Sequence, residues 1–116
     1  MKESFIYDFK TKYFEGMLLH AFNKSPAIKE ILGQDHSGYG DPIMSQENMH
    51  LIDSLTKLDN QKMVSDSAWS IEHMHEGVGG KRVLDYVLAK YQSKWLDSIA
   101  KARCRLFIKD WKSADR

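Results

Sequence analysis

The chain contains 116 residues (13.5 kDa), enough for one domain with a single hydrophobic core and too few for a catalytic domain with a separate regulatory domain. Apolar residues make up 42% and charged residues 28%, a balance typical of folded domains, which excludes a largely disordered chain. The longest apolar runs, such as Leu106-Phe107-Ile108, are far shorter than the roughly 20 residues that a membrane-spanning helix needs, so no membrane protein is expected.

The formal net charge of +1 is distributed unevenly along the chain. Residues 1–80 carry 7 Lys or Arg against 12 Asp or Glu, a net −5, whereas residues 81–116 carry 10 against 4, a net +6. Such asymmetry is typical of proteins that bind nucleic acid or an acidic partner, although opposite charges can also meet inside one molecule.

The cysteine content bears on the cellular compartment. Cys104 is the single cysteine, so the chain cannot form an internal disulfide bond. The sequence also opens without a recognisable targeting leader. Together these features predict a reducing, cytoplasmic location.

The first third of the chain predicts two helices and a loop. Apolar residues recur at helical spacing over residues 3–22, in a series that runs Phe5, Phe9, Tyr13, Met17 and Ala21. Ser25-Pro26 is a typical pair of N-cap and first-turn residues, and it predicts a short helix that ends at Gly33. Residues 33–45 contain Gly38-Tyr39-Gly40-Asp41-Pro42, which predicts a loop.

A further helix is predicted after this loop. Ser45 is placed to cap a helix that begins at Gln46, and apolar residues continue at helical spacing to about Met74. Asp59-Asn60-Gln61 leaves open whether the segment is one long helix or two short ones. The glycines in residues 77–80 predict a break.

The segment from Lys81 to about Lys112 contains neither Gly nor Pro, which predicts one continuous helix, the longest of the chain. No segment shows the strict alternation of apolar and polar residues that a strand requires. We therefore expect an all-α fold, in which residues 1–116 form a single domain: a small bundle of four to five helices that ends in a long basic C-terminal helix.

Two apolar stripes run along this C-terminal segment when it is projected as one straight helix. The first is predicted to face the core and comprises Leu84, Leu88, Tyr91, Trp95, Ile99, Ala102 and Leu106. The second comprises Leu96, Ala100, Cys104, Phe107 and Trp111. A second stripe is expected in the central helix of a bundle, or in a helix that a partner or a second copy covers; in the latter case Leu96, Phe107 and Trp111 form the interface of a complex or homodimer.

Between the stripes the same projection places a row of cations, here called the basic ridge: Lys90, Lys94, Lys101, Arg105, Lys109 and Lys112. The acids of the segment project outside this row, so the ridge is predicted to lack counter-charges on its own face. Six like charges on one face repel one another, and nucleic-acid phosphate is the usual compensator. The alternatives are acidic helices of residues 1–80, within the chain or across a dimer, and a membrane surface.

Few residues suggest a chemical site. Glu72 and His75 share a helix face, as in half of a di-metal site, but no second half exists, so neither a metal nor a cofactor is predicted. Cys104 falls in an apolar stripe, where thiols are usually inert. Lys81 and Arg82 follow the glycines and could contact a single anion at the start of a helix. Because no acid–base pair or activated nucleophile is assembled, we expect no catalytic residues and no enzyme.

A resemblance to a known family rests on short runs near the C-terminus. Residues 91–100, 106–111 and 113–115 form a series of aromatic, Ser, Ile-Ala and Trp residues that, with residues 38–42 and 51–55, resembles the phage late-gene antitermination proteins of the Q type. The resemblance implies a helix-turn-helix whose first helix Ser93 caps. The sequence departs from that pattern at the turn, because residues 101–105 lack a turn glycine and place Arg103 and Arg105 at apolar positions, so a continuous helix is preferred.

These observations predict a small non-enzymatic regulator that binds DNA or a nucleoprotein complex through the basic ridge. The alternative is a protein–protein interaction module or inhibitor, of the type encoded by phages and plasmids, that uses its charged and aromatic helix faces.

Overall fold

The computed structural model describes residues 2–35, 44–73 and 83–114, with side chains in 2–35, 44–65 and 83–110. Over these residues the chain forms five α-helices and no strand, which confirms the predicted all-α bundle. The helices are α1 (Lys2–Ala21), α2 (Pro26–Gln34), α3 (Gln46–His73), α4 (Val83–Tyr91) and α5 (Lys94–Ala114).

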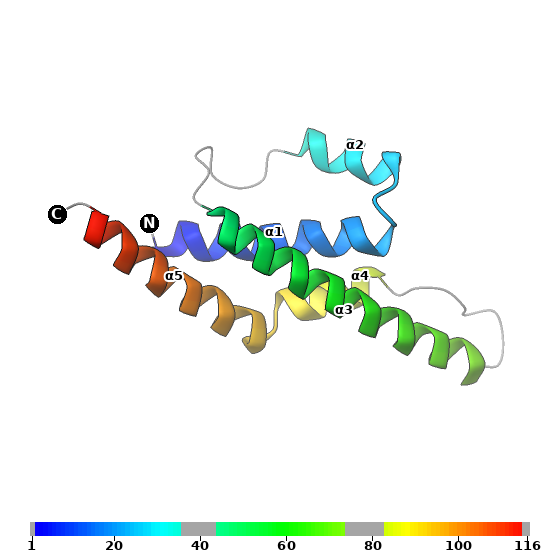
Figure 1. Ribbon diagram of the computed structural model, residues 1–116. Coiled ribbons are helices and arrows are strands. Elements are labelled where there is room, and N and C mark those ends of the chain that lie inside the picture. Colours follow the sequence, from blue (N-terminus) through cyan, green and yellow to red (C-terminus); the bar gives the residue numbers. More distant parts are fainter. Residues whose placement is uncertain (1, 36–43, 74–82, 115–116) are drawn as a thin grey trace.

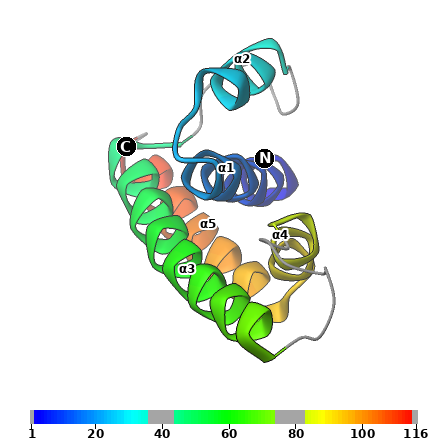
Figure 2. The ribbon, with the colours of Figure 1, turned by 90° about the vertical axis from the view of Figure 1, so that its right-hand side faces the viewer.

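Helix α1 is the centre of the bundle and packs against each of the other four helices (Figures 1 and 2). In the end-on view of Figure 2, α3 and α5 lie on one side of α1, α4 lies on another, and α2 lies above it. The side chains that α1 contributes to the core are fully buried and follow the predicted spacing: Phe5, Phe9, Tyr13, Met17 and Ala21. One regular apolar face thus organises the whole core.

Helices α1 and α3 approach each other closely at Gly16. A Cβ atom placed on Gly16 would lie 3.0 Å from Cγ2 of Thr56, which is tighter than ordinary van der Waals contact. The Thr56 hydroxyl donates hydrogen bonds to the carbonyls of Ile52 (2.8 Å) and Asp53 (3.0 Å) in its own helix, so its polar group is satisfied while its methyl group faces α1. The absent side chain of Gly16 lets the two helices approach.

The connection from α1 to α2 is a tight turn that ends the first helix. The amide of Lys24 donates to the carbonyl of Leu19 (2.7 Å) and the amide of Asn23 donates to His20 (3.2 Å), the paired hydrogen bonds of a Schellman motif. Asn23 and Lys24 both have positive φ angles, of 54° and 52°. Ser25 then caps α2, as predicted, by accepting a hydrogen bond from the amide of Ile28 (3.4 Å).

Helix α3 begins after Ser45, whose Oγ accepts from the amide of Asn48 (3.1 Å), as predicted. It runs for 28 residues, so residues 59–61 lie within one long helix. Asp59 does not end the helix because its carboxylate turns into the core and accepts a hydrogen bond from Tyr13. The longest helix is therefore α3, and the prediction that the last helix is the longest was wrong.

The predicted continuous helix over residues 81–112 was also wrong, because the chain turns at residues 92–93. The Ser93 side chain bonds to both helix ends at this turn. Its hydroxyl donates to the carbonyl of Lys90 in α4 (2.6 Å) and accepts from the amide of Leu96 in α5 (3.1 Å). Helix α5 continues through residues 101–105, so the implied helix-turn-helix turn at that place is absent. Most of the predicted loop 33–45 and the glycine break 77–80 lie outside the described residues.

The burial pattern corrects the predicted roles of the two apolar stripes. The core side of α5 is formed by Leu96, Ala100 and Cys104, which are almost completely buried. The residues of the predicted core stripe are instead exposed or half-buried; among them, Leu84, Leu88, Trp95 and Leu106 have exposed fractions of 40% to 61%. The predicted phase is wrong in both helices, because α4 buries Val83 and Val87 in place of Leu84 and Leu88, and α5 buries Leu96 in place of Trp95.

Candidate functional site

Helix α5 presents a row of four exposed cations on the side away from the core. We call Lys94, Lys101, Arg105 and Lys109 the basic face; they follow one another at spacings of seven, four and four residues, which aligns them along one side of a helix. All four side chains are exposed, whereas Leu96 and Ala100 on the opposite side are buried. These four members of the ridge are thus exposed in the structure, a point that the sequence left open.

Counter-charges on the basic face are few. The carboxylate of Asp97 contacts Nζ of Lys101 (2.7 Å) and Nζ of Lys10 from α1 (2.9 Å). Hydrogen bonds from Lys101 and then Lys10 hold the pKa of Asp97 below its usual range. The prediction that no acid of this segment meets the ridge was therefore wrong for Asp97.

The other three cations of the basic face are not neutralised in this way. Within the part of the chain that the structure describes, Lys94, Arg105 and Lys109 form no ion pair. The acidic helices of residues 1–80 therefore do not cover this row, at least among the described side chains. The positive potential of these three side chains of α5 is directed to solvent.

The remaining cations of the predicted ridge are placed differently. Lys90 belongs to α4, is half-buried, and lies over the ring of Trp95, with Nζ 4.6 Å from the ring centroid, and more distantly over Tyr86 (5.7 Å). It is therefore separated from the basic face by the turn at Ser93. The backbone of Lys112 continues α5, but its side chain lies outside the described residues, as do Lys81 and Arg82 altogether.

The predicted interface of Leu96, Phe107 and Trp111 is corrected by the packing of α5 on α1. Leu96 is completely buried within the chain, and Phe107 is half-buried and stacks on Phe5 with ring centroids 5.0 Å apart. These two side chains hold α5 to the bundle and leave little surface for a partner. The side chain of Trp111 lies outside the described residues.

Arg103 has a role that the sequence did not indicate. Its Nε donates a 2.6 Å hydrogen bond to Oδ1 of the buried Asn48, and its guanidinium lies 3.4 Å from a carboxylate oxygen of Glu47. Arg103 thereby joins α5 to the first turn of α3. Because Arg103 and Asn48 are 55 residues apart in the sequence, no local pattern could have revealed the pairing.

The potentially reactive groups are either buried or outside the described residues. Cys104 is buried beside α1, and burial raises the pKa of its thiol, which favours the inert protonated form. The side chains of Glu72, His73 and His75 lie outside the described residues. The described side chains contain no group of three or more His, Cys, Asp or Glu residues that could hold a metal ion.

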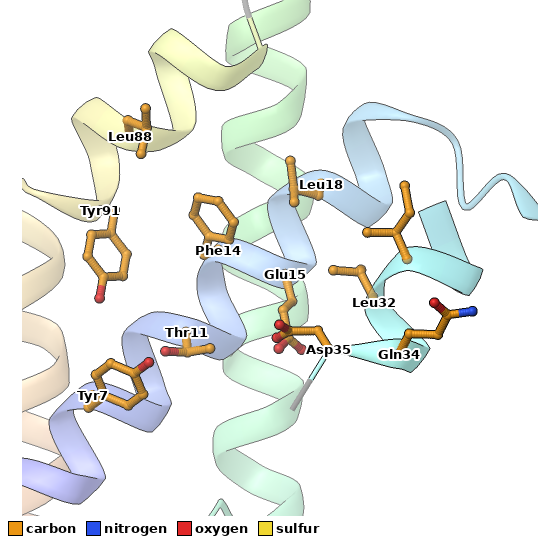
Figure 3. Close-up of a pocket in the computed structure, with 11 residues that line it drawn as sticks. Tyr7, Thr11, Phe14, Glu15, Leu18, Leu32, Gln34, Asp35, Leu88 and Tyr91 are labelled. Atoms are coloured by element: carbon orange, nitrogen blue, oxygen red, sulfur yellow. The ribbon is translucent and has the colours of Figure 1, made fainter. Parts of the chain in front are cut away.

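A second surface, which sequence reasoning did not place, is an apolar groove between α1, α2 and α4 (Figure 3). It encloses about 480 Å³ and is lined mainly by apolar and aromatic side chains: Tyr7, Phe14 and Leu18 of α1, Ile31 and Leu32 of α2, and Leu88 and Tyr91 of α4. The large number of aromatic residues in the first helix was the available signal for it.

Comparison with known proteins found no matching family model, curated protein or solved structure for this chain. Among the described helices, none has the length and apolar character needed to cross a membrane.

Proposed function

We propose that this protein is a small non-enzymatic regulator that binds DNA through the basic face of α5. The observation that carries the proposal is the alignment of Lys94, Lys101, Arg105 and Lys109 on one exposed side of a single helix. Three of these cations have no ion-pair partner among the described residues. Such a row is the electrostatic footprint that phosphate backbones compensate.

The dimensions of the basic face suit a nucleic-acid backbone. Lys94 and Lys109 are fifteen residues apart, which corresponds to roughly 22 Å along the axis of a helix. An α-helix fits the major groove of duplex DNA, with cations reaching the phosphates on its borders. Neutralising a phosphate releases condensed counterions, so each contact adds affinity that depends on salt.

The composition of the face favours contacts to phosphate over contacts to bases. Ser98 lies between Lys94 and Lys101 on the same side of α5, and the row contains no Asn or Gln, the side chains that commonly read adenine. Because residues 101–105 are helical, the proposal does not depend on a helix-turn-helix. We therefore expect binding with weak sequence preference, in which a nucleoprotein partner supplies any further specificity.

The test is a titration of labelled mixed-sequence duplex DNA of about 20 base pairs, followed by fluorescence anisotropy. With four phosphate contacts the slope of log K against log salt is about −3.6, so affinity should fall roughly 100-fold between about 50 and 200 mM salt. The variant Lys94→Gln/Arg105→Gln/Lys109→Gln should bind much more weakly at low salt and reduce the slope by about 3.

The matched control removes three exposed lysines of α2 and α3 instead, in the variant Lys29→Gln/Lys57→Gln/Lys62→Gln. Both variants have the same net charge, so only the control should keep the binding and the salt slope of the original protein. Equal losses in the two variants would show that net charge alone attracts DNA and would refute the proposal. Displacement of DNA by polyglutamate at equal charge would favour an acidic protein surface as the ligand.

A further inference from the structure

Helix α1 carries a second apolar stripe in addition to the one that forms the core. Tyr7, Thr11, Phe14 and Leu18 follow one another at spacings of four, three and four residues, about 130° around the helix from the buried stripe. This spacing is the seam that an α-helix offers to another helix. The core helices cover the first stripe and leave the second on the floor of the groove (Figure 3).

The walls of the groove are apolar and remain accessible. Tyr91 of α4 packs edge-on against Phe14, with ring centroids 6.1 Å apart, and fixes one side of the floor. Three large lining side chains are strongly exposed: Tyr7 at 41%, Leu88 at 48% and Ile31 at 62%. A contiguous exposed patch of this kind is typical of protein-interaction sites.

The length of the groove favours a helical occupant over a compact small molecule. The floor runs from Tyr7 to Leu18, eleven residues of α1, which corresponds to roughly 16 Å or three helical turns. Leucine-type side chains at successive turns of a docked helix would meet this floor along its whole length.

The charges of the lining residues indicate which helix fits. The ionisable acids of the lining are Glu15 and Asp35, whose carboxyl groups lie between α1 and the end of α2 in Figure 3. Among the described residues the lining contains no Lys, Arg or His, and Lys12 on the outer surface of α1 lies 3.6 Å from the carboxylate of Glu15. The groove is therefore acidic at its α2 side, and a partner gains affinity and orientation from basic residues.

We propose that this groove receives an amphipathic helix of a partner protein, with its apolar stripe on Tyr7, Phe14 and Leu18 and with Lys or Arg beside Glu15 and Asp35. This docking site is separate from the basic face of α5 and does not depend on DNA binding.

The experiment uses two synthetic peptides of about four helical turns, each with leucines along one face. One peptide carries lysines beside the leucines and the other carries glutamates. Binding is followed on the full-length protein by NMR spectra of its Leu and Ile methyl groups. The lysine peptide should shift the methyl signals of Leu18, Leu32 and Leu88, and it should leave Leu106 on α5 unchanged.

Two variants distinguish binding in the groove from nonspecific hydrophobic binding of the peptide. Leu88→Asp should weaken the affinity for the lysine peptide by at least about tenfold, because it places a charge in the docking surface. Leu106→Asp changes a leucine outside the groove whose exposed fraction (46%) is close to that of Leu88 (48%). This control should bind the lysine peptide as tightly as the original protein does. The variant Glu15→Gln/Asp35→Asn removes both negative charges of the lining and should reduce the preference for the lysine peptide over the glutamate peptide.

Three results would overturn the proposal. The first is equal binding of both peptides, and the second is shifts confined to α5. The third is a protein that sediments as a dimer on its own and becomes monomeric in Leu88→Asp, since a second copy would then fill the groove.

Discussion

The hydroxyl of Tyr13 in α1 donates a hydrogen bond of 2.5 Å to the carboxylate of Asp59 in α3, and both side chains are buried. Burial, followed by the hydrogen bond to Asp59, raises the pKa of Tyr13. A polar pair therefore joins α1 to α3, beside the ring of Trp95, which meets Tyr13 edge-on with centroids 6.0 Å apart.

Removing the Tyr13 hydroxyl should destabilise the fold, because the buried carboxylate of Asp59 then lacks its hydrogen-bond donor. Tyr13→Phe leaves the carboxylate of Asp59 without this partner, so the free energy of unfolding should fall by about 1–3 kcal/mol in urea denaturation. The double variant Tyr13→Phe/Asp59→Leu should regain most of the loss, because both polar groups are then gone. An unchanged unfolding midpoint in Tyr13→Phe would contradict this account.

High pH should act on the same pair. Since the folded state raises the pKa of Tyr13, the contribution of this group is fully present below the tyrosine pKa of about 10 in the unfolded chain. Above that value the unfolded chain loses a proton that the folded protein keeps, so stability should fall by about 1.4 kcal/mol per pH unit. Urea midpoints of the original protein and of Tyr13→Phe should be measured from about pH 8 to 11. The two midpoints should differ at the lower end of this range and converge as the pH rises. If the two plots of urea midpoint against pH stayed parallel, Tyr13 would not be the group responsible for the loss of stability at high pH.

Low pH should weaken the link between α1 and α5. Lys101 and Lys10 lower the pKa of Asp97 in the folded state, so its contribution is present above the unfolded value of about 3.9. It is lost as the pH falls through the folded value, because the protonated carboxyl no longer attracts the two ammonium groups. Thermal melts between about pH 5 and 2.5 should show a smaller acid-induced decrease in Asp97→Asn than in the original protein, with exposed Asp110→Asn as control. High salt should reduce the difference.

Two glycines on different helices should respond in opposite directions to alanine. Gly16→Ala places its Cβ 3.0 Å from Thr56, and we expect a loss of about 1–3 kcal/mol, larger than the roughly 1 kcal/mol gained in helix propensity. Gly33→Ala meets nothing within 4 Å and should raise stability by up to about 1 kcal/mol. Thermal unfolding of both variants gives the comparison. Equal stabilisation in both would mean that α1 and α3 do not approach closely at Gly16.

Local patterns in the sequence were sufficient for the parts of the fold that local interactions determine. The apolar series of α1 and the caps at Ser25 and Ser45 were predicted and are present. The cap at Ser93 is also present, but it was expected only in the helix-turn-helix alternative and a continuous helix was preferred, because a serine hydroxyl satisfies backbone groups within a helix or at its end, and only packing decides between the two. The sequence left open whether the basic face is exposed, because acidic helices of residues 1–80 could have covered its cations within the chain.

The surfaces that depend on several helices could not be predicted in the same way. The contact of Lys10 with Asp97 joins two helices that are distant in sequence, and no periodicity encodes it. The choice of Leu96 over Trp95 as the core residue of α5 depends on how closely α1 approaches. The groove needs α2 and α4 to be placed on either side of α1, an arrangement set by turns whose geometry the sequence only outlines.

The stacking of Phe5 on Phe107 has a consequence for biosynthesis. Because α1 is synthesised before α5 and Phe107 of α5 packs on Phe5, α5 must emerge from the ribosome before the core of the bundle can close. Until that moment the aromatic side chains of α1 lack their final cover, and they are the surface that a chaperone would meet on the nascent protein.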